Sequence, residues 1–332
     1  RQRQMCIRDR GYHVESCSAE PLPPNAVVEK KIASVEAVAE SIKKVVARSG
    51  TKTKRAAVAV SNSAVITKNI SLPASLSEQE METQIQVEAE QYIPYPLEEV
   101  NIDFDVLGPA PSDPDRVEVL LAASRRENVD DRVSALVIAG LSATLVDVEA
   151  YAMEKACRLL ANGQAEQTRE RVIALADLGA TTTKLHVLHD HKIVYTREQN
   201  FGGRQLTDEI HRHYDLAPGS AYPGKPPGEL PDYYPPEILT PFKDAVAQQI
   251  SRALQFFYST SAYNRIDQIV LAGGTSNLEG LAELVAERNT VPTQIANPFS
   301  EMSISARVNP EQLQQDAPAM MIAAGLALRS FD

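Results

Sequence analysis

A carboxylate that ends an apolar run, followed by glycine and threonine, is the feature of this chain best suited to chemistry. Residues 172–183 read VIALADLGATTT, and the run with strand character ends at Asp177. Such a strand end presents backbone N–H groups and hydroxyls to a phosphate, and the carboxylate is left to hold a hydrated metal ion. The alternative is an ordinary tight hairpin with a polar turn. The predicted site residues are Asp177, Gly179, Ala180, Thr181 and Thr182.

A second apolar run, IVLAGGT at residues 269–275, ends in Gly273, Gly274 and Thr275. Glycines at such a position let the backbone approach a flat ligand closely. We expect a helix over residues 278–288 with Asn277 as its cap, and the start of this helix would add N–H donors. Either run alone is a weak signal. Together they predict a nucleotide held between two lobes.

The two runs resemble the second phosphate loop and the adenosine loop of the actin-like ATPase superfamily. A narrower resemblance covers nearly all of residues 11–332 and is carried by DLGATTTKLHVL, QYIPYPLEEVNIDFDVLG, LAGGTSNLEGL and APAMMIAAGLALRSF. These runs resemble the PilM family, the cytoplasmic actin-like proteins of type IV pilus assembly. The resemblance implies a bilobal α/β actin-like ATPase fold, with duplicated mixed-sheet lobes, that binds ATP and Mg²⁺.

The resemblance also implies roles for residues outside these two runs. Gly202 and Gly203 fall where the superfamily backs the phosphates, although a Gly-Gly turn before a helix is equally expected on structural grounds. Lys225 falls where relatives place a helical run against the adenosine, but the local sequence GSAYPGK contains two helix breakers. Glu149 falls where related ATPases orient the attacking water, and a favourable interaction with the helix dipole explains it equally well. Nucleoside contacts are implied for Gly273, Gly274, Thr275 and Asn277.

The composition limits the class of partner. A net charge of −11 argues against a general nucleic-acid binder and against broad attachment to anionic lipid. No apolar run approaches the roughly 20 residues that span a bilayer, so direct membrane insertion is not expected. Three cysteines at scattered spacing form no disulfide framework. We therefore expect a cytoplasmic protein, and the resemblance implies that a partner recruits it to the inner membrane.

The chain divides into segments of different character. Residues 1–10, RQRQMCIRDR, carry four arginines and resemble a translated sequencing-adapter fragment, with a genuine basic tail as the alternative. Only one D-x-G-x hairpin is present, so the first phosphate hairpin is expected to be missing. Residues 12–19 should form a first-lobe strand. The expected domains are the first lobe (11–62 and 146–170), an inserted α+β subdomain (63–145), the second lobe (171–316) and a terminal helix packing back on the core (317–332).

The inserted subdomain should follow the order β-α-β-β-α-β. Ser77 and Glu80 predict a capping box for its first helix. The middle strands, residues 100–106 and 117–124, should be joined by the polar turn GPAPSDPDR. Two helices against a small sheet would leave a groove for a peptide. The predicted partner-binding residues are Tyr92, Ile93, Pro94 and Tyr95, and the alternative is that they only end the helix and pack on the sheet.

Two functions remain open. The resemblance implies an ATP-binding assembly protein with slow ATP hydrolysis or none and a capacity for self-association. It would bind the cytoplasmic N-terminal tail of PilN and contact other platform and motor proteins of the pilus. The alternative is a small-molecule kinase of the same fold, acting on a sugar or a carboxylate. Such an enzyme needs a catalytic base aligned with a substrate hydroxyl, and we identify no such base in the sequence.

Overall fold

The computed structural model describes residues 11–110, 113–161, 171–214 and 236–331. The chain forms two compact units. The first unit is Ser18–Glu149, and the second unit is Arg1–Cys17 together with Ala150–Asp332. The predictions for residues 1–10 and for Lys225 lie outside the described residues.

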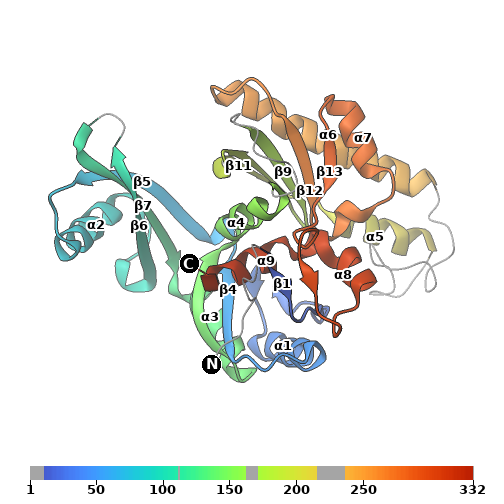
Figure 1. The fold of residues 1–332 in the computed structure, drawn as a ribbon, viewed down its shortest axis with the longest axis horizontal. Helices are drawn as coiled ribbons and strands as arrows, with labels where there is room; N and C mark the ends of the chain where they lie inside the picture. Colours follow the sequence, from blue (N-terminus) through green and yellow to red (C-terminus); the bar gives the residue numbers. More distant parts are fainter. Residues whose placement is uncertain (1–10, 111–112, 162–170, 215–235, 332) are drawn as a thin grey trace. The chain divides into compact units, whose positions relative to one another are not determined.

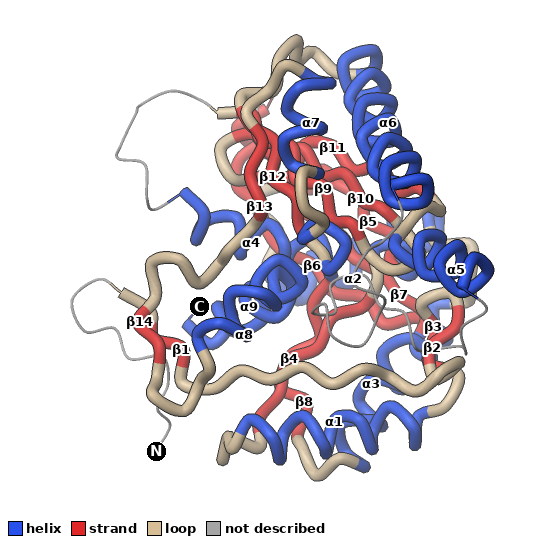
Figure 2. Tube along the Cα trace, turned by 90° about the vertical axis from the view of Figure 1, so that its right-hand side faces the viewer, coloured by secondary structure: helices blue, strands red, loops and turns tan. Residues whose placement is uncertain are grey.

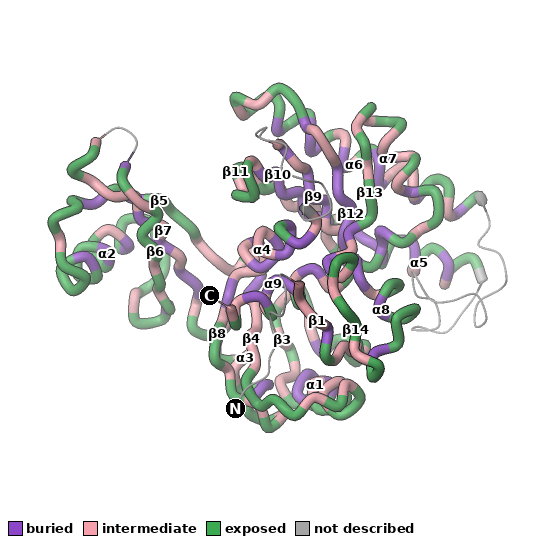
Figure 3. The backbone as a smooth tube through the Cα atoms, in the orientation of Figure 1, coloured by how far each residue is buried: buried purple, intermediate pink, exposed green. Residues whose placement is uncertain are grey.

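A five-stranded mixed sheet forms the centre of the second unit, in the order β11-β10-β9-β12-β13. Strands β9 (Val172–Leu178), β10 (Thr183–His189) and β11 (Lys192–Gln199) are antiparallel neighbours. Strand β12 (Gln268–Ala272) runs parallel to β9 on one side and to β13 (Thr293–Ile295) on the other. Strands β9 and β12 are almost wholly buried (Figure 3), as expected for apolar strands covered on both faces.

One face of this sheet packs against α5 (Gly203–Tyr214), α6 (Pro236–Thr260) and α7 (Leu281–Asn289). The apolar residues of α6 share one side, so the predicted amphipathic helix is confirmed, with Phe257 fully buried among strand side chains. Figure 2 shows α6 and α7 lying along the sheet. The opposite face packs against α4 (Glu149–Ala161) and α9 (Met321–Leu328), with Met153, Leu175 and Met321 in one cluster.

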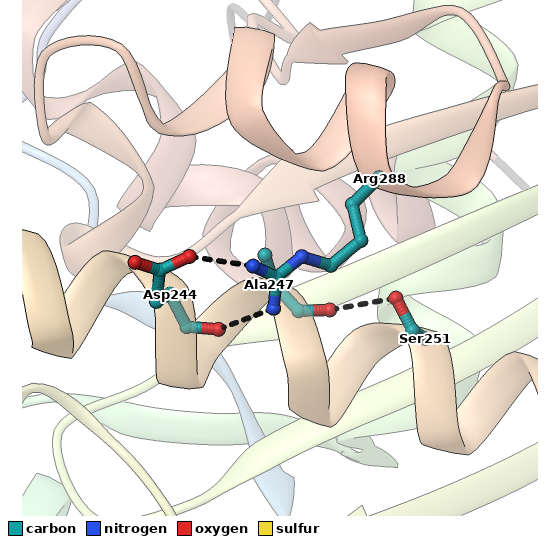
Figure 4. A network of polar contacts seen from close by, with 4 residues as sticks. All are labelled: Asp244, Ala247, Ser251 and Arg288. Atoms are coloured by element: carbon teal, nitrogen blue, oxygen red, sulfur yellow. Dashed lines mark hydrogen bonds and ion pairs between the residues drawn. The ribbon is translucent and has the colours of Figure 1, made fainter.

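Polar contacts join α6 to α7 at the surface of the second unit (Figure 4). The guanidinium of Arg288 on α7 donates to the Asp244 carboxylate at 2.5 Å and to the Asp244 carbonyl at 3.1 Å. The Ser251 hydroxyl lies 2.9 Å from the Ala247 carbonyl and 2.8 Å from Asn289 Oδ1. Because exposed ion pairs contribute at most about 1 kcal/mol, these contacts orient α7 while the buried side chains hold it.

The segment after Gly11 forms much less strand than predicted. Only His13–Val14 (β1) is extended, and it pairs in parallel with β14 (Ser303–Ile304) of the second unit. The prediction of a strand over residues 12–19 is therefore wrong in length. The reason is that β14 offers only two residues for pairing, and the side chains of Val14 and Cys17 then pack against Leu313 on α8 (Pro310–Asp316).

The first unit contains a second, smaller parallel sheet. Strand β4 (Arg55–Val60) pairs with β8 (Ser142–Val148), and α1 (Val35–Ser49) packs against α3 (Arg126–Ile138). The Ser34 hydroxyl accepts from the Ala37 N–H, and Gly50, at φ 65°, ends α1 as predicted. The short strands β2 (Val27–Val28) and β3 (Lys31–Ile32) form a hairpin just before α1 in the sequence.

A three-stranded antiparallel sheet, in the order β5-β7-β6, makes up the rest of the first unit. Helix α2 (Glu78–Tyr92) covers one face of strands β5 (Val65–Pro73), β6 (Val100–Ala110) and β7 (Asp113–Arg125) (Figure 1). The predicted capping box is confirmed, since Ser77 N–H donates to the Glu80 carboxylate at 2.9 Å while the Ser77 hydroxyl accepts from the Glu80 N–H.

Two expectations for this region are wrong. The sequence GPAPSDPDR does not form only a turn, because both strands extend into it and Pro109 pairs with Val117. The glycine at 108, with φ 132°, lets β6 continue past a register shift. The second predicted helix, α3, does not lie on this sheet, because its apolar residue Ala135 packs against α1 instead.

The close contact between α9 and α4 in the second unit provides a test of the fold. A Cβ atom at Gly325 would overlap the Ala152 carbonyl group. Changing Gly325 to alanine should therefore lower the free energy of unfolding by about 1–3 kcal/mol, because the two helices must separate. Thermal melting measures this change. The exposed neighbour Ala323, changed to serine, should melt like the unaltered chain, and equal melting of both variants would contradict the packing described.

Candidate functional site

The register between β9 and β12 brings the two predicted loops together. In this parallel pair Asp177 lies opposite Ala272, the last residue of its strand. Both strands therefore end at the same edge of the sheet, with the loop of residues 179–182 beside Gly273 and Gly274. Carboxyl ends of parallel strands are where α/β folds place their ligands.

The loop of residues 179–182 is held by the start of α5. Within the turn the Gly179 N–H donates to the Thr182 carbonyl at 3.0 Å. From α5, the Gly203 N–H donates to the Gly179 carbonyl at 3.0 Å, and the Arg204 N–H donates to the Ala180 carbonyl at 2.7 Å. Ala180 and Thr181 at the tip are exposed. The backbone of the loop is thus fixed while its tip is accessible to a ligand.

Two glycines are required by the closeness of neighbouring backbones. A Cβ atom at Gly202 would lie 2.5 Å from the Gly179 carbonyl oxygen and 2.6 Å from that of Ala180. At Gly273, where φ is 84°, a Cβ atom would lie 2.8 Å from Asp177 Oδ1. A side chain at either position would push the loop of residues 179–182 or the Asp177 carboxylate aside. Glycine at these positions therefore keeps three strand ends in backbone contact.

The segment after Gly274 differs from the predicted helix start. Residues Gly274–Asn277 form a 3₁₀ turn, and α7 begins only at Leu281, after Gly280 in the left-handed conformation. Asn277 is not the cap of this helix, because its side-chain amide donates to the Gln315 carbonyl at 2.6 Å. Thr275 lies closer to the site, with its hydroxyl 3.4 Å from the Gly179 carbonyl.

A row of polar side chains that the sequence analysis missed runs beside Asp177. In the β9–β10 pair Lys184 lies directly opposite Asp177, and Lys184 is only 6% exposed. His186, two residues along the same face, is 1% exposed and its Nδ1 lies 3.0 Å from the Thr196 hydroxyl. Burial and, to a smaller extent, the Lys184 charge lower the pKa of His186 to about 4. The signal in the sequence is the alternation KLHVL, which places Lys184 and His186 on one face.

The residues at Asp177 fit a hydrated metal ion rather than a fully chelated one. Among the residues that the structure describes, His, Cys, Asp and Glu gather in no group of three or more that would hold a metal ion. Magnesium commonly keeps several waters and takes one or two carboxylates together with substrate phosphates. One half-buried carboxylate beside an accessible loop tip is compatible with that mode of binding.

Glu149 is the first residue of α4 and belongs to the first unit, whereas Asp177 belongs to the second. Its charge acts on Arg132. Burial lowers the pKa of Arg132, and the nearby carboxylates of Glu149 and Asp131 act in the opposite direction. The water-orienting role of Glu149 stays a prediction.

A cavity of about 250 Å³ lies in the first unit, and the predicted peptide-anchor residues Ile93 and Tyr95 line it. Its apolar wall includes Ile66 and Val100. Tyr92 does not line the cavity, since its ring is exposed and lies under Lys68 at 5.1 Å. A peptide side chain could therefore be enclosed at Tyr95 but not at Tyr92.

Basic side chains on the cavity wall were not predicted. Lys30, Lys31 and Arg125 line the cavity, and the Arg125 guanidinium lies 5.4 Å above the Tyr95 ring. A terminal nitrogen of Arg125 lies 3.4 Å from the Glu127 carboxylate, and its Nε atom is buried with no hydrogen-bond partner among the described residues. These residues come from distant segments of the sequence, which is why no local motif revealed them.

Arg132 fixes the backbone behind this cavity. Its Nε donates to the Ala59 carbonyl at 2.9 Å, and its terminal nitrogens donate to the carbonyls of Asn128 at 2.7 Å and Lys30 at 3.3 Å. Asn128 and Lys30 both line the cavity. The single guanidinium thus holds β4, α3 and the β2–β3 turn in one arrangement.

The glycine contacts can be tested without a ligand. Changing Gly202 to alanine should shift the loop of residues 179–182, lower the free energy of unfolding by about 1–3 kcal/mol and speed hydrogen exchange at Gly179 and Arg204. Thermal melts and exchange of these amides measure the effect. Gly274 is the matched control, since a Cβ atom there meets nothing within 4 Å. Equal exchange in the two alanine variants would refute the contact.

The family of the chain follows from its similarity to known proteins. The sequence model described as "Type IV pilus assembly protein PilM" matches residues 4–331. A solved structure titled "PilM-PilN type IV pilus biogenesis complex" has a TM-score of 0.76 and 30% identity, covering 96% of this chain and 92% of that chain. Along the part of the chain that the structure describes, no helix is both long and apolar enough to cross a bilayer.

Two more distant structures are also similar to this chain, and only the first of them, EutJ, bears on the fold. Ethanolamine utilization protein EutJ from Carboxydothermus hydrogenoformans has a TM-score of 0.51 at 15% identity, covering 91% of this chain and 77% of that chain. Ta0583, an archaeal actin homolog, has a TM-score of 0.42 at 13% identity, covering 87% of this chain and 74% of that chain. The fold is mixed α/β and actin-like, a fold that typically binds nucleotides. The chain belongs to the PilM family of type IV pilus assembly proteins.

Proposed function

We propose that this chain is a cytoplasmic, ATP-binding component of the type IV pilus platform that binds the cytoplasmic N-terminal tail of PilN. The observation that carries the nucleotide part is the backbone contact of Gly202 and Gly273 with residues 177–180. The observation that carries the partner part is the cavity at Tyr95, together with the 30% identity to a chain solved in a PilM-PilN complex.

The loop of residues 179–182 would hold the phosphates. Its accessible residues, Ala180 and Thr181, offer backbone N–H groups and a hydroxyl, and Asp177 would hold hydrated Mg²⁺. The metal would supply positive charge to the phosphate oxygens. Gly273, Gly274 and Thr275 would contact the nucleoside, with Gly202 and Gly203 behind the phosphates. Asn277 and Lys225 stay implied by the resemblance alone.

Slow ATP hydrolysis, or none, fits an assembly protein whose nucleotide stabilises one conformation. Glu149 is the residue that would orient water if hydrolysis occurs. ATP turnover that rises with an added sugar or carboxylate would instead favour the kinase alternative. Turnover that does not respond to either would support the assembly function.

The PilN tail would enter the cavity with an apolar side chain. Ile66, Ile93 and Val100 supply apolar wall, and Tyr95 supplies a rigid aromatic surface at low entropic cost. Lys30, Lys31 and Arg125 line this wall together with the carboxylate of Glu29, and such polar groups suit the backbone carbonyls and N–H groups of a peptide. PilN would then recruit the chain to the inner membrane, where other platform and motor proteins are available for contact.

We also propose that the first lobe of this chain is without its phosphate hairpin. Strand β12 has parallel neighbours on both sides and is almost completely buried after Gln268. Strand β4 reads equally apolar, RAAVAV, yet pairs only with β8 among the described residues, and most of it is half-buried. The outer edge of β4 is therefore where a hairpin equivalent to β9–β10 would pair.

Changing Asp177 to alanine tests the nucleotide assignment. ATP binding in the presence of Mg²⁺ should weaken by about ten- to a hundredfold, the range of one charge-assisted contact. Binding of ADP without metal should change less, because the carboxylate acts through the metal ion. Calorimetric titration with and without Mg²⁺ measures both affinities. Equal losses in the two titrations would leave Asp177 as a structural turn residue.

Changing Tyr95 to alanine tests the partner site. Affinity for a labelled peptide of the PilN N-terminal tail should fall by about tenfold or more, because the cavity loses its aromatic wall. Tyr92 is the matched control, since it is also an exposed aromatic at the end of α2 but lies outside the cavity. Fluorescence anisotropy measures both. Equal losses at the two tyrosines, or none, would move the partner site elsewhere.

A further inference from the structure

Lys184 is the most buried lysine side chain near the candidate phosphate site, and it lies at the centre of the sheet. It belongs to β10, which is covered by β9 and β11 on its two edges. Only 6% of Lys184 is exposed. Burying an ammonium group away from water is costly unless an opposite charge compensates it. The position therefore requires an anionic neighbour.

The register identifies two such neighbours. Lys184 lies directly opposite Asp177 on β9 and directly opposite Glu198 on β11, and residues directly opposite on one face have Cβ atoms about 4.5–5.5 Å apart. Both carboxylates are half-buried. The next residue on the same face of β10, His186, is fully buried and hydrogen-bonded to Thr196, so its neutral ring offers no compensating negative charge. The pleat thus presents two carboxylates to Lys184, and of these Asp177 is the one that lies beside the loop of residues 179–182.

The other face of the sheet is apolar at this point. Side chains of Leu185 and Val187 point there, into the cluster formed with Phe257 and Ile269. On the Lys184 face, Glu154 of α4 accepts from the Ile193 N–H at 2.8 Å, on β11. A carboxylate already bound to the backbone of the edge strand is a weaker candidate than the two carboxylates directly opposite Lys184.

We propose that Lys184 is an internal counter-charge of Asp177, shared with Glu198, and lowers the dependence of phosphate binding at the loop of residues 179–182 on Mg²⁺. This inference rests on the proposed nucleotide-binding function. With Lys184 present, the negative charge next to the phosphates is reduced, so metal-free ATP is repelled less. Without Lys184, Asp177 would repel a metal-free phosphate and attract a cation more strongly. In this proposal Lys184 does not contact the nucleotide, and it acts by changing the electrostatic potential at Asp177.

The test uses the full chain and the variants Lys184→Met, Asp177→Asn and the double variant. Affinity for ATP is measured with Mg²⁺ and with a chelator. For Lys184→Met the ratio of the two dissociation constants, chelator over Mg²⁺, should rise by about ten- to a hundredfold. For Asp177→Asn the ratio should fall. Lys192→Met, which removes an exposed lysine at the start of β11, is the control and should keep the ratio of the unaltered chain.

Thermal melting supplies a second measurement that needs no nucleotide. Each single variant should melt lower, and the double variant should lose less than the sum of the two, because a pair is removed together. An unchanged ratio in Lys184→Met overturns the proposal, and so do additive losses in melting temperature. If the unaltered chain binds ATP under neither condition, the proposed function fails, and the melts alone then decide whether the pair exists.

Discussion

The parallel pairing of β9 with β12 is the constraint on which the candidate site depends. Two segments far apart in the sequence end at the same edge only because Asp177 and Ala272 lie opposite each other. A shift of one residue would turn Asp177 to the other face of the sheet, since successive side chains alternate. The apolar side chains on both faces, such as Leu175 and Ile269, make that shift costly and so fix the position of the carboxylate.

Local patterns predicted local structure well. Ser34 with Gly50, and Ser77 with Glu80, marked helix ends correctly because capping depends on residues within one turn. The prediction failed where a residue had a distant partner. Asn277 reads as a cap, yet its amide reaches Gln315, and only the folded chain brings these two residues together.

The candidate site was predictable in part for the same reason. Asp177 and the glycines form contiguous motifs, so their types and spacing indicated phosphate chemistry directly. The role of Lys184 could not be predicted from the sequence, because only the register of β9 with β10 places it opposite Asp177. The cavity at Tyr95 was less predictable, because Lys30 and Arg125 reach it from separate elements and follow no periodic pattern.

Arg132 has a consequence for how the first unit becomes competent to bind. Its guanidinium joins carbonyl groups from α3, from β4 and from the β2–β3 turn, and the most distant of them, that of Lys30, is 102 positions from Arg132 along the chain. The walls of the cavity are therefore complete only after these segments have assembled. If the cavity is the partner site that we propose, a newly synthesised chain would capture its partner only once the first unit is folded. Assembly of the larger complex would in this way select finished subunits.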